Sequence, residues 1–322
     1  MQNETPKNYQ ILLFYKYVFI NNPEEVMQTQ RELCEKLGLK GRLIIAREGL
    51  NITLEGTVEN TEEYIKELEK DSRFHNIHFK RSLDNGNSFP KLSVKVRPEI
   101  VSLHLGTCDI DPNEVTGTHL KAEDLYEWLN PSSDGSQKKE FYIVDMRNAY
   151  EHKVGYFENS ILPDLKNFRD LPKLVKQLKH LKDKTVVTVC TGGVRCEKAS
   201  GFLITQGFND VYQLDGGIVS YMEKYPNEDF VGKLYVFDKR VMMGFYTDDP
   251  KHKVVGKCDI CKTQSEHFVN CENVGCHRHF IACVECVVKA GGIIKCPGRC
   301  VITRSGKEIK SPFWNRITSL FK

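Results

Sequence analysis

The sequence lacks a long apolar run. Crossing a bilayer takes about 18 consecutive apolar residues, whereas the best candidate, residues 11–20, is shorter and carries Lys16. No basic segment of the kind that opens a signal peptide precedes it. We therefore expect no membrane helix and no secretory leader, and hence a cytoplasmic protein.

Two cofactor signatures are also missing. We find no set of two histidines and a carboxylate typical of redox iron, and no flavin fingerprint. Cysteine is scarce over most of the chain: of twelve, only Cys34, Cys108, Cys190 and Cys196 lie outside residues 258–300. Without a secretory leader, dense cysteine favours metal binding or catalysis over disulfides.

The remaining composition is that of a globular protein. The 322 residues are 40% apolar and 28% charged, which excludes disordered and fibrous classes and suits about two domains of roughly 150 residues. The charge is uneven, because residues 251–322 hold 13 basic and 5 acidic side chains, a net charge of +8. Such a block is often only a solvated face, but it also suits a surface that binds phosphates.

Residues 1–100 have the pattern of a ferredoxin-like (acylphosphatase-like) α+β domain. Apolar periodicity predicts one helix that begins at Pro23 and a second that Thr61 caps, with strands in residues 10–19, 42–46, 52–56, 77–82 and 91–97. The order strand-helix-strand-strand-helix-strand is that of the ferredoxin-like fold.

Residues 118–228 alternate strands and helices, which is typical of an α/β domain with a parallel sheet and helices on its faces. The predicted helices cover residues 121–129, 171–182 and 196–207, and the predicted strands cover residues 141–146, 185–190 and 211–214.

The loop after the strand 185–190 is the candidate active site. Backbone N–H groups of so tight a loop can converge on the Cys190 sulfur, and the helix N-terminus and Arg195 add positive potential that favours a thiolate or persulfide. The two glycines allow the backbone to curl this closely. A buried cysteine beside an ordinary glycine turn is the alternative. The candidate catalytic residues are Cys190 and Arg195, with the loop residues Thr191, Gly192, Gly193, Val194 and Cys196.

The loop spacing separates two chemistries. A phosphatase loop of this type places five residues between cysteine and arginine, whereas four separate Cys190 from Arg195, so the cradle suits a sulfur better than a phosphate. Cys196 either resolves a persulfide or disulfide on Cys190 or is a small buried hydrophobe.

These residues resemble the rhodanese superfamily. The likeness lies in VDMRNAYEH, which contains Asp145, Arg147 and Glu151, in the Cys190 loop, and in LDGGI at residues 214–218. We expect Asp145 and Arg147 to form a structural ion pair beneath the loop.

A closer likeness lies in CTGGVRCEKAS, RLIIAREGLNITLEG and VFDKRV, which are similar to segments of the rhodanese-type tRNA uridine hydroxylases. The resemblance implies an oxidoreductase that converts the wobble uridine of tRNA into 5-hydroxyuridine with molecular oxygen. It also implies that the protein binds the anticodon arm of the tRNA. Cys190 would attack the pyrimidine ring or carry a reactive sulfur or oxygen species, while Arg195 and the loop amides would stabilise the developing anion.

Residues 229–322 form a connector and a cysteine-rich tail. Two CxxC pairs separated by 21 residues, with two further pairs interleaved, predict about two structural zinc ions in a crossed arrangement. His267, His277 or His279 can replace one cysteine, and scattered thiols or disulfides are the alternative. The predicted ligand sets are Cys258, Cys261, Cys283 and Cys286 for one ion, and Cys271, Cys276, Cys296 and Cys300 for the other.

The tail is also the predicted RNA contact. Its exposed cations and aromatics can hold an RNA backbone and stack an unpaired base, with Lys307, Lys310 and Arg316 as the binding candidates. A solvated stabilising cap is the alternative, and the RNA would then contact Arg42, Arg47, Lys80 and Arg81 of the first domain.

Two other functions fit the same residues. The first is a sulfurtransferase that passes persulfide sulfur from Cys190 to a small acceptor or a partner protein. The second is a non-catalytic RNA-binding scaffold whose rhodanese domain only recognises a partner.

Overall fold

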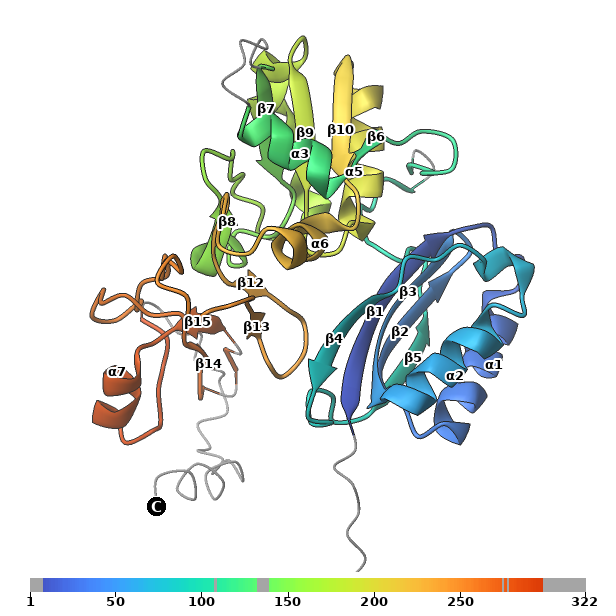
Figure 1. Ribbon diagram of the computed structural model, residues 1–322, viewed down its shortest axis with the longest axis horizontal. Helices are drawn as coiled ribbons and strands as arrows, with labels where there is room; N and C mark the ends of the chain where they lie inside the picture. Colours follow the sequence, from blue (N-terminus) through green and yellow to red (C-terminus); the bar gives the residue numbers. More distant parts are fainter. Residues whose placement is uncertain (1–7, 107–108, 132–138, 274, 277, 298–322) are drawn as a thin grey trace, which may run out of the picture. The chain divides into compact units, whose positions relative to one another are not determined.

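The computed structural model describes residues 8–106, 109–131, 139–273, 275–276 and 278–297 (Figure 1). The chain divides into two compact units, Met1–Lys253 and Val254–Lys322. Among the described residues, none of the helices is both long and apolar enough to pass through a bilayer.

The first domain is a five-stranded sheet with strand order β4-β1-β3-β2-β5, in which β2 and β5 are parallel and the other pairs antiparallel. This confirms the predicted ferredoxin-like order, and the strand predicted at residues 91–97 forms β5 at the edge of the sheet. In Figure 1 both helices lie on one face of the sheet. The elements are β1 (Tyr9–Tyr17), α1 (Pro23–Lys36), β2 (Lys40–Ala46), β3 (Gly49–Thr57), α2 (Val58–Leu68), η1 (Ser72–Phe74), β4 (Lys80–Asp84) and β5 (Leu92–Val96).

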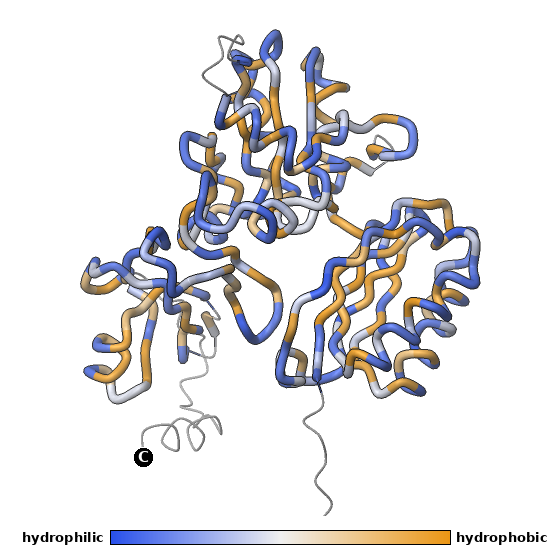
Figure 2. Tube along the Cα trace, in the orientation of Figure 1, coloured by the Kyte–Doolittle hydropathy of each residue, from blue (hydrophilic) through white to orange (hydrophobic). Residues whose placement is uncertain are grey.

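The two faces of this sheet have different surroundings because strand side chains alternate. Leu12 and Phe14 of β1 point into the core with Tyr64 of α2. Their neighbours Leu13 and Tyr15 lie on the opposite face, which α1 and α2 leave free. Figure 2 shows these strands as mainly hydrophobic, so apolar residues occupy both faces.

The second helix begins earlier than predicted. Its N-cap is Thr57, whose hydroxyl accepts the Asn60 N–H at 3.3 Å. Thr61 lies one turn inside the helix, fully buried, and donates to the Thr57 carbonyl oxygen at 2.9 Å. The prediction of Thr61 as the cap was wrong because the helical spacing of Tyr64, Ile65 and Leu68 does not extend into the first turn, where Val58 is followed by Glu59, Asn60 and Thr61.

The second domain contains a four-stranded parallel sheet with strand order β6-β10-β9-β7, which confirms the predicted architecture. Its elements are β6 (Thr118–Leu120), α3 (Ala122–Leu129), β7 (Phe141–Asp145), η3 (His152–Val154), β8 (Gly155–Phe157), η4 (Phe168–Asp170), α4 (Leu171–Leu174), η5 (Val175–Leu181), β9 (Thr185–Val189), α5 (Val194–Thr205), β10 (Asp210–Leu214) and α6 (Gly217–Lys224). The short strands β11 (Phe230–Gly232), β12 (Leu234–Tyr235) and β13 (Met242–Met243) follow.

Both faces of the parallel sheet are covered. Val186 of β9 packs into one core and the next residue, Val187, into the other, as expected of a sheet between two helical layers.

Residues 171–182, predicted as one helix, form α4 followed by the 3₁₀ segment η5. Leu171, Leu174, Leu178 and Leu181 are all buried, and the three-residue spacing between members of this set suits 3₁₀ geometry as well as a helix.

In the unit 254–322, the described residues contain little regular structure. A hairpin of β14 (Phe268–Asn270) and β15 (His279–Ile281) precedes the short helix α7 (Val284–Lys289). Its buried cluster consists of Cys258, Cys271, Phe280, Ala282, Ile294 and Cys296. Since half of these side chains are cysteines, an apolar core alone is too small to hold this unit together.

Candidate functional site

Cys190 lies at the carboxyl end of β9, immediately before a loop that leads into α5. Gly193 caps α5 with φ +100°, a conformation that favours glycine. The loop packs against the turn before α6, where a Cβ on Gly217 would lie 2.6 Å from the Gly193 nitrogen. The loop conformation thus depends on glycine in two separate segments.

The surroundings of Cys190 favour the thiolate. Burial alone would raise the pKa of its thiol. The Cys196 thiol, the Arg195 charge and the backbone N–H groups of Cys196 and Arg195 oppose that effect and lower the pKa of Cys190 to about 6. The structure therefore brings together the amide cradle and the positive charge that the sequence predicts, around a fully buried sulfur.

Cys196 is a hydrogen-bond donor to Cys190. Burial, followed by the hydrogen bond and the charge of Cys190, raises the pKa of Cys196 well above its ordinary value. Of the two thiols, Cys190 therefore loses its proton first, while Cys196 keeps its own. Cys190 is the nucleophile of the pair.

Arg195 is held by Glu151, a partner that the sequence analysis did not assign. The guanidinium donates Nη1 to Glu151 Oε1 at 2.6 Å and Nη2 to Glu151 Oε2 at 2.9 Å, and it also donates to Thr191 Oγ1 at 3.1 Å. Both charged groups are buried. Arg195 thus stays charged and braces the loop as well as favouring the thiolate.

The expected ion pair of Asp145 and Arg147 is confirmed. Both side chains are fully buried, and Arg147 Nη2 lies 2.6 Å from Asp145 Oδ2. Arg147 also donates to the Gly155 carbonyl oxygen at 2.8 Å. This pair ties the end of β7 to β8 and is structural.

The first domain covers the Cys190 loop. Leu13 and Tyr15 of β1 are the side chains that a Cβ on Gly192 or Gly193 would meet, at 3.0 and 2.9 Å. Tyr15 donates its hydroxyl to Glu197 Oε1 at 2.9 Å. A side chain at either glycine would therefore displace Leu13 or Tyr15 from the loop.

The buried carboxylate of Glu197 connects several elements. Besides Tyr15 it accepts hydrogen bonds from Thr116 and Gln213, both at 2.9 Å, and contacts His119 Nε2 at 3.0 Å. Lys198, the next residue, is fully buried and lies 2.7 Å from both Glu48 and Asp109. These contacts join α5 to the first domain on two sides.

A cavity of about 470 Å³ lies between the open face of the first sheet and the Cys190 loop, a size usual for small-molecule sites. Thr191, Gly192, Val194 and Arg195 form its floor. Asp238 is the one acidic residue among the described lining residues, and it pairs with Arg240 at 2.7 Å. The cationic lining consists of Arg42, Lys80, Arg81, Arg169, Arg195 and Arg240.

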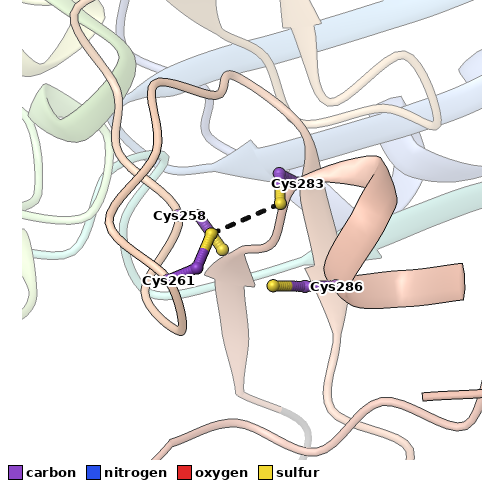
Figure 3. Close-up of side chains that lie close together, drawn as sticks. All are labelled: Cys258, Cys261, Cys283 and Cys286. Atoms are coloured by element: carbon purple, nitrogen blue, oxygen red, sulfur yellow. Dashed lines mark hydrogen bonds between the residues drawn. The ribbon is translucent and has the colours of Figure 1, made fainter. Parts of the chain in front are cut away.

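The tail cysteines form two groups, each with ligand atoms within 4.8 Å of one another. The first holds Cys258, Cys261, Cys283 and Cys286 (Figure 3), where the Cys261 and Cys283 sulfurs lie 3.5 Å apart. Four thiolates about 2.3 Å from one zinc ion would be roughly 3.8 Å apart. The geometry therefore fits a tetrahedral metal site.

The second group holds Cys271, Cys276 and Cys296, with the Cys276 and Cys296 sulfurs 3.6 Å apart. Cys300 and His277 lie outside the described residues. His267 instead hydrogen-bonds the Ala282 carbonyl oxygen at 2.8 Å through Nδ1. The RNA-binding candidates Lys307, Lys310 and Arg316 also lie outside the described residues.

We expect the reactivity of Cys190 to follow its lowered pKa. Alkylation of Cys190 by iodoacetamide, measured by peptide mass spectrometry, should rise with pH through about 6 and then level off, whereas an ordinary thiol still gains reactivity near pH 8.5. Cys196→Ala removes a hydrogen-bond donor to Cys190 and should raise the pH at which alkylation is half-maximal. Cys196→Ser keeps a donor and should return this pH to about its wild-type value. A midpoint near 8.5 in the wild-type protein would contradict the thiolate assignment.

Comparison with known proteins matches three segments of the chain. Residues 9–100 match the UPF0176 acylphosphatase like domain, residues 122–224 the Rhodanese-like domain, and residues 231–301 the Rhodanase C-terminal family.

Curated relatives match nearly the whole chain. The tRNA uridine(34) hydroxylase of Cytophaga hutchinsonii is 43% identical over 286 residues, which cover 89% of this chain and 88% of that protein. The protein of the same name from Bacillus licheniformis is 42% identical over 280 residues, covering 86% and 84%. That from Oceanobacillus iheyensis is 41% identical over 285 residues, covering 88% and 85%.

Proposed function

This chain belongs to the tRNA uridine(34) hydroxylase family, and we propose that it hydroxylates C5 of uridine 34 with molecular oxygen, using the Cys190 thiolate. The observation that carries the proposal is the Cys190 thiolate, buried in a loop whose next residues, Thr191 and Gly192, line a cavity with cationic walls. The name of the relatives supports uridine 34 of tRNA as the substrate. The geometry of the loop supports Cys190 as the reacting residue.

The chemistry of uracil explains why a thiolate is useful. The C5–C6 double bond is conjugated to the C4 carbonyl, so a thiolate that adds to C6 moves an electron pair toward C5 and O4. C5 then becomes the electron-rich carbon that attacks molecular oxygen. One oxygen atom stays on C5 as the hydroxyl, and a two-electron reductant converts the other into water. Loss of the C5 proton and cleavage of the S–C6 bond restore the double bond and release the Cys190 thiolate. The loop amides and the Arg195 charge hold Cys190 in the anionic form that this addition requires.

The thiolate is not open to solvent. Cys190 is fully buried, and Leu13 and Tyr15 pack on the glycines beside it. Access to the sulfur therefore requires these side chains to move away, which couples the reaction to the position of the first domain.

We assign zinc to the cysteine groups of the tail. Four thiolates leave no open position on zinc, so the ion would hold the fold rather than react. The described ligands are Cys258, Cys261, Cys283 and Cys286 of one group, and Cys271, Cys276 and Cys296 of the other, with Cys300 as the fourth ligand of the second ion.

Nucleoside analysis tests the function. Total tRNA from a strain that lacks the gene should contain no 5-hydroxyuridine, and the gene should restore it. Purified protein assayed with thiosulfate and cyanide tests the sulfurtransferase alternative. Restored 5-hydroxyuridine excludes the scaffold, whereas sulfur transfer without any change in tRNA would favour the sulfurtransferase.

RNA binding by the tail should depend strongly on salt. Each phosphate contact releases roughly 0.7 to 0.9 counterions, so changing Lys307, Lys310 and Arg316 to Gln should lower the slope of log affinity against log salt by about two to three units. A matched control changes three exposed lysines of α4 and η5, Lys173, Lys176 and Lys179, and should leave the slope nearly unchanged. An unchanged slope in the tail variant would move the contact to Arg42, Arg47, Lys80 and Arg81.

A further inference from the structure

Lys80 is a buried cation without an acceptor. It is the first residue of β4 and is only 8% exposed. Its ammonium lies 5.6 Å from the Tyr15 ring centroid, and within the described part of the chain no hydrogen bond or ion pair reaches it. Placing an ammonium without a hydrogen-bond acceptor in a largely buried position costs free energy, so an acceptor supplied by a ligand would be bound favourably there.

Lys80 lines the cavity beside the Cys190 loop, and it also lines a neighbouring pocket that contains Asp215 and Glu197. The walls beside it are apolar and aromatic, with Leu13, Tyr15 and Phe237, which suits the faces of a planar base. The group that such a cation lacks is an oxygen acceptor, above all one that gains negative charge during a reaction.

We propose that Lys80 donates a hydrogen bond to O4 of the uracil that enters this cavity. The inference rests on the proposed function. Addition of the Cys190 sulfur to C6 forms the S–C6 bond, opens the C5–C6 double bond and places the displaced electron pair on O4 as an enolate. The Lys80 ammonium stabilises that oxygen, and no proton needs to move in this step.

The same contact distinguishes uracil from cytosine. Cytosine carries an amino group where uracil carries O4, so the ammonium would face another donor. A buried donor without an acceptor penalises the wrong base, which makes Lys80 a specificity-determining residue.

The groups that face Lys80 set the pH range of the contact. Burial lowers its pKa to about 8, against the opposing charges of Asp215, Cys190 and Glu197. Tyr15 of β1 and His78, just before β4, also lie close. Because Cys190 must be deprotonated and Lys80 protonated, the rate should be bell-shaped between about 6 and about 8.

Binding of anticodon stem-loop RNAs tests the contact. The two probes carry uridine or cytidine at position 34 and are otherwise identical. The wild-type protein should prefer uridine about 10- to 100-fold, the range of a charge-assisted hydrogen bond. Lys80→Met should lose that preference, and Lys80→Arg should keep most of it. The control Lys95→Met removes an exposed lysine from β5 of the same sheet and should behave as wild type.

Further outcomes distinguish a failure of the Lys80 contact with O4 from a failure of the proposed hydroxylation. Lys80→Arg should extend the alkaline limb of the pH–rate profile, a shift that a merely structural role would not produce. A Lys80→Met protein of unchanged melting temperature that still prefers uridine overturns the contact, as does one that hydroxylates at the wild-type rate. A wild-type protein that prefers uridine through Lys80 but never modifies it supports the contact and refutes the hydroxylation.

Discussion

Replacing Cys190 by alanine abolishes hydroxylation of uridine 34 and leaves the chain folded. The substitution removes the thiolate on which the reaction depends, while the two domains keep their separate apolar cores. We expect a loss of stability of about 1 kcal/mol, comparable to one buried methylene. The readout is 5-hydroxyuridine in tRNA from the deletion strain carrying the variant, with the melting temperature measured on purified protein.

Cys34→Ala is the matched control. Cys34 is also fully buried, and burial raises the pKa of its thiol to about 12, so it is an inert thiol in the core of the first domain. We expect wild-type activity from this variant, and partial loss or none from Cys196→Ala. If Cys190→Ala restores 5-hydroxyuridine as well as Cys34→Ala does, the nucleophile has been assigned wrongly.

Metal removal has the second large effect. We expect about two zinc ions per chain, because the described cysteines form one group of four and one of three and Cys300 completes the second. Metal analysis of protein purified without chelator gives the number. Cys258→Ser should reduce it to about one.

Loss of zinc should unfold residues 254–322 before the rest. Structural zinc supplies roughly 10 to 16 kcal/mol in small domains, and this unit has few buried apolar side chains to replace that contribution. Proteolysis of chelated protein should therefore cut this unit first and leave residues 1–253 intact. Metal content near zero with free thiols in a folded unit would refute the zinc assignment.

The parts of the structure that follow from local sequence were predictable. The order of elements identifies the ferredoxin-like α+β domain and the α/β domain with its parallel sheet. The spacing of the tail cysteines predicted two ligand sets, and the seven of these cysteines that the structure describes lie in two matching groups. In each case the pattern and its consequence lie within a few residues or follow from simple periodicity.

The contacts that complete the site were not predictable. Arg195 pairs with Glu151, 44 residues away, and Tyr15 donates to Glu197 across 182 residues. Lys198 reads as a surface residue of a helix, yet it is buried against Glu99, 99 residues away. The only local signal was the charged pair Glu197 and Lys198 at the start of an otherwise apolar helix, and it does not identify their partners. The sequence identified Lys80 only as one of four cationic residues that could contact RNA. Its burial beside the Cys190 loop is apparent only from the fold.

Position-resolved mass spectrometry of a tRNA with uridine at position 34 shows whether the Cys190 thiolate is needed to place an oxygen atom from O2 on that nucleotide. The tRNA comes from the deletion strain carrying the wild-type gene or Cys190→Ala, grown under isotopically heavy oxygen gas. We expect one heavy oxygen on nucleotide 34 with the wild-type protein and unmodified uridine with the variant. Unmodified uridine with both proteins, or heavy oxygen with both, would contradict this expectation.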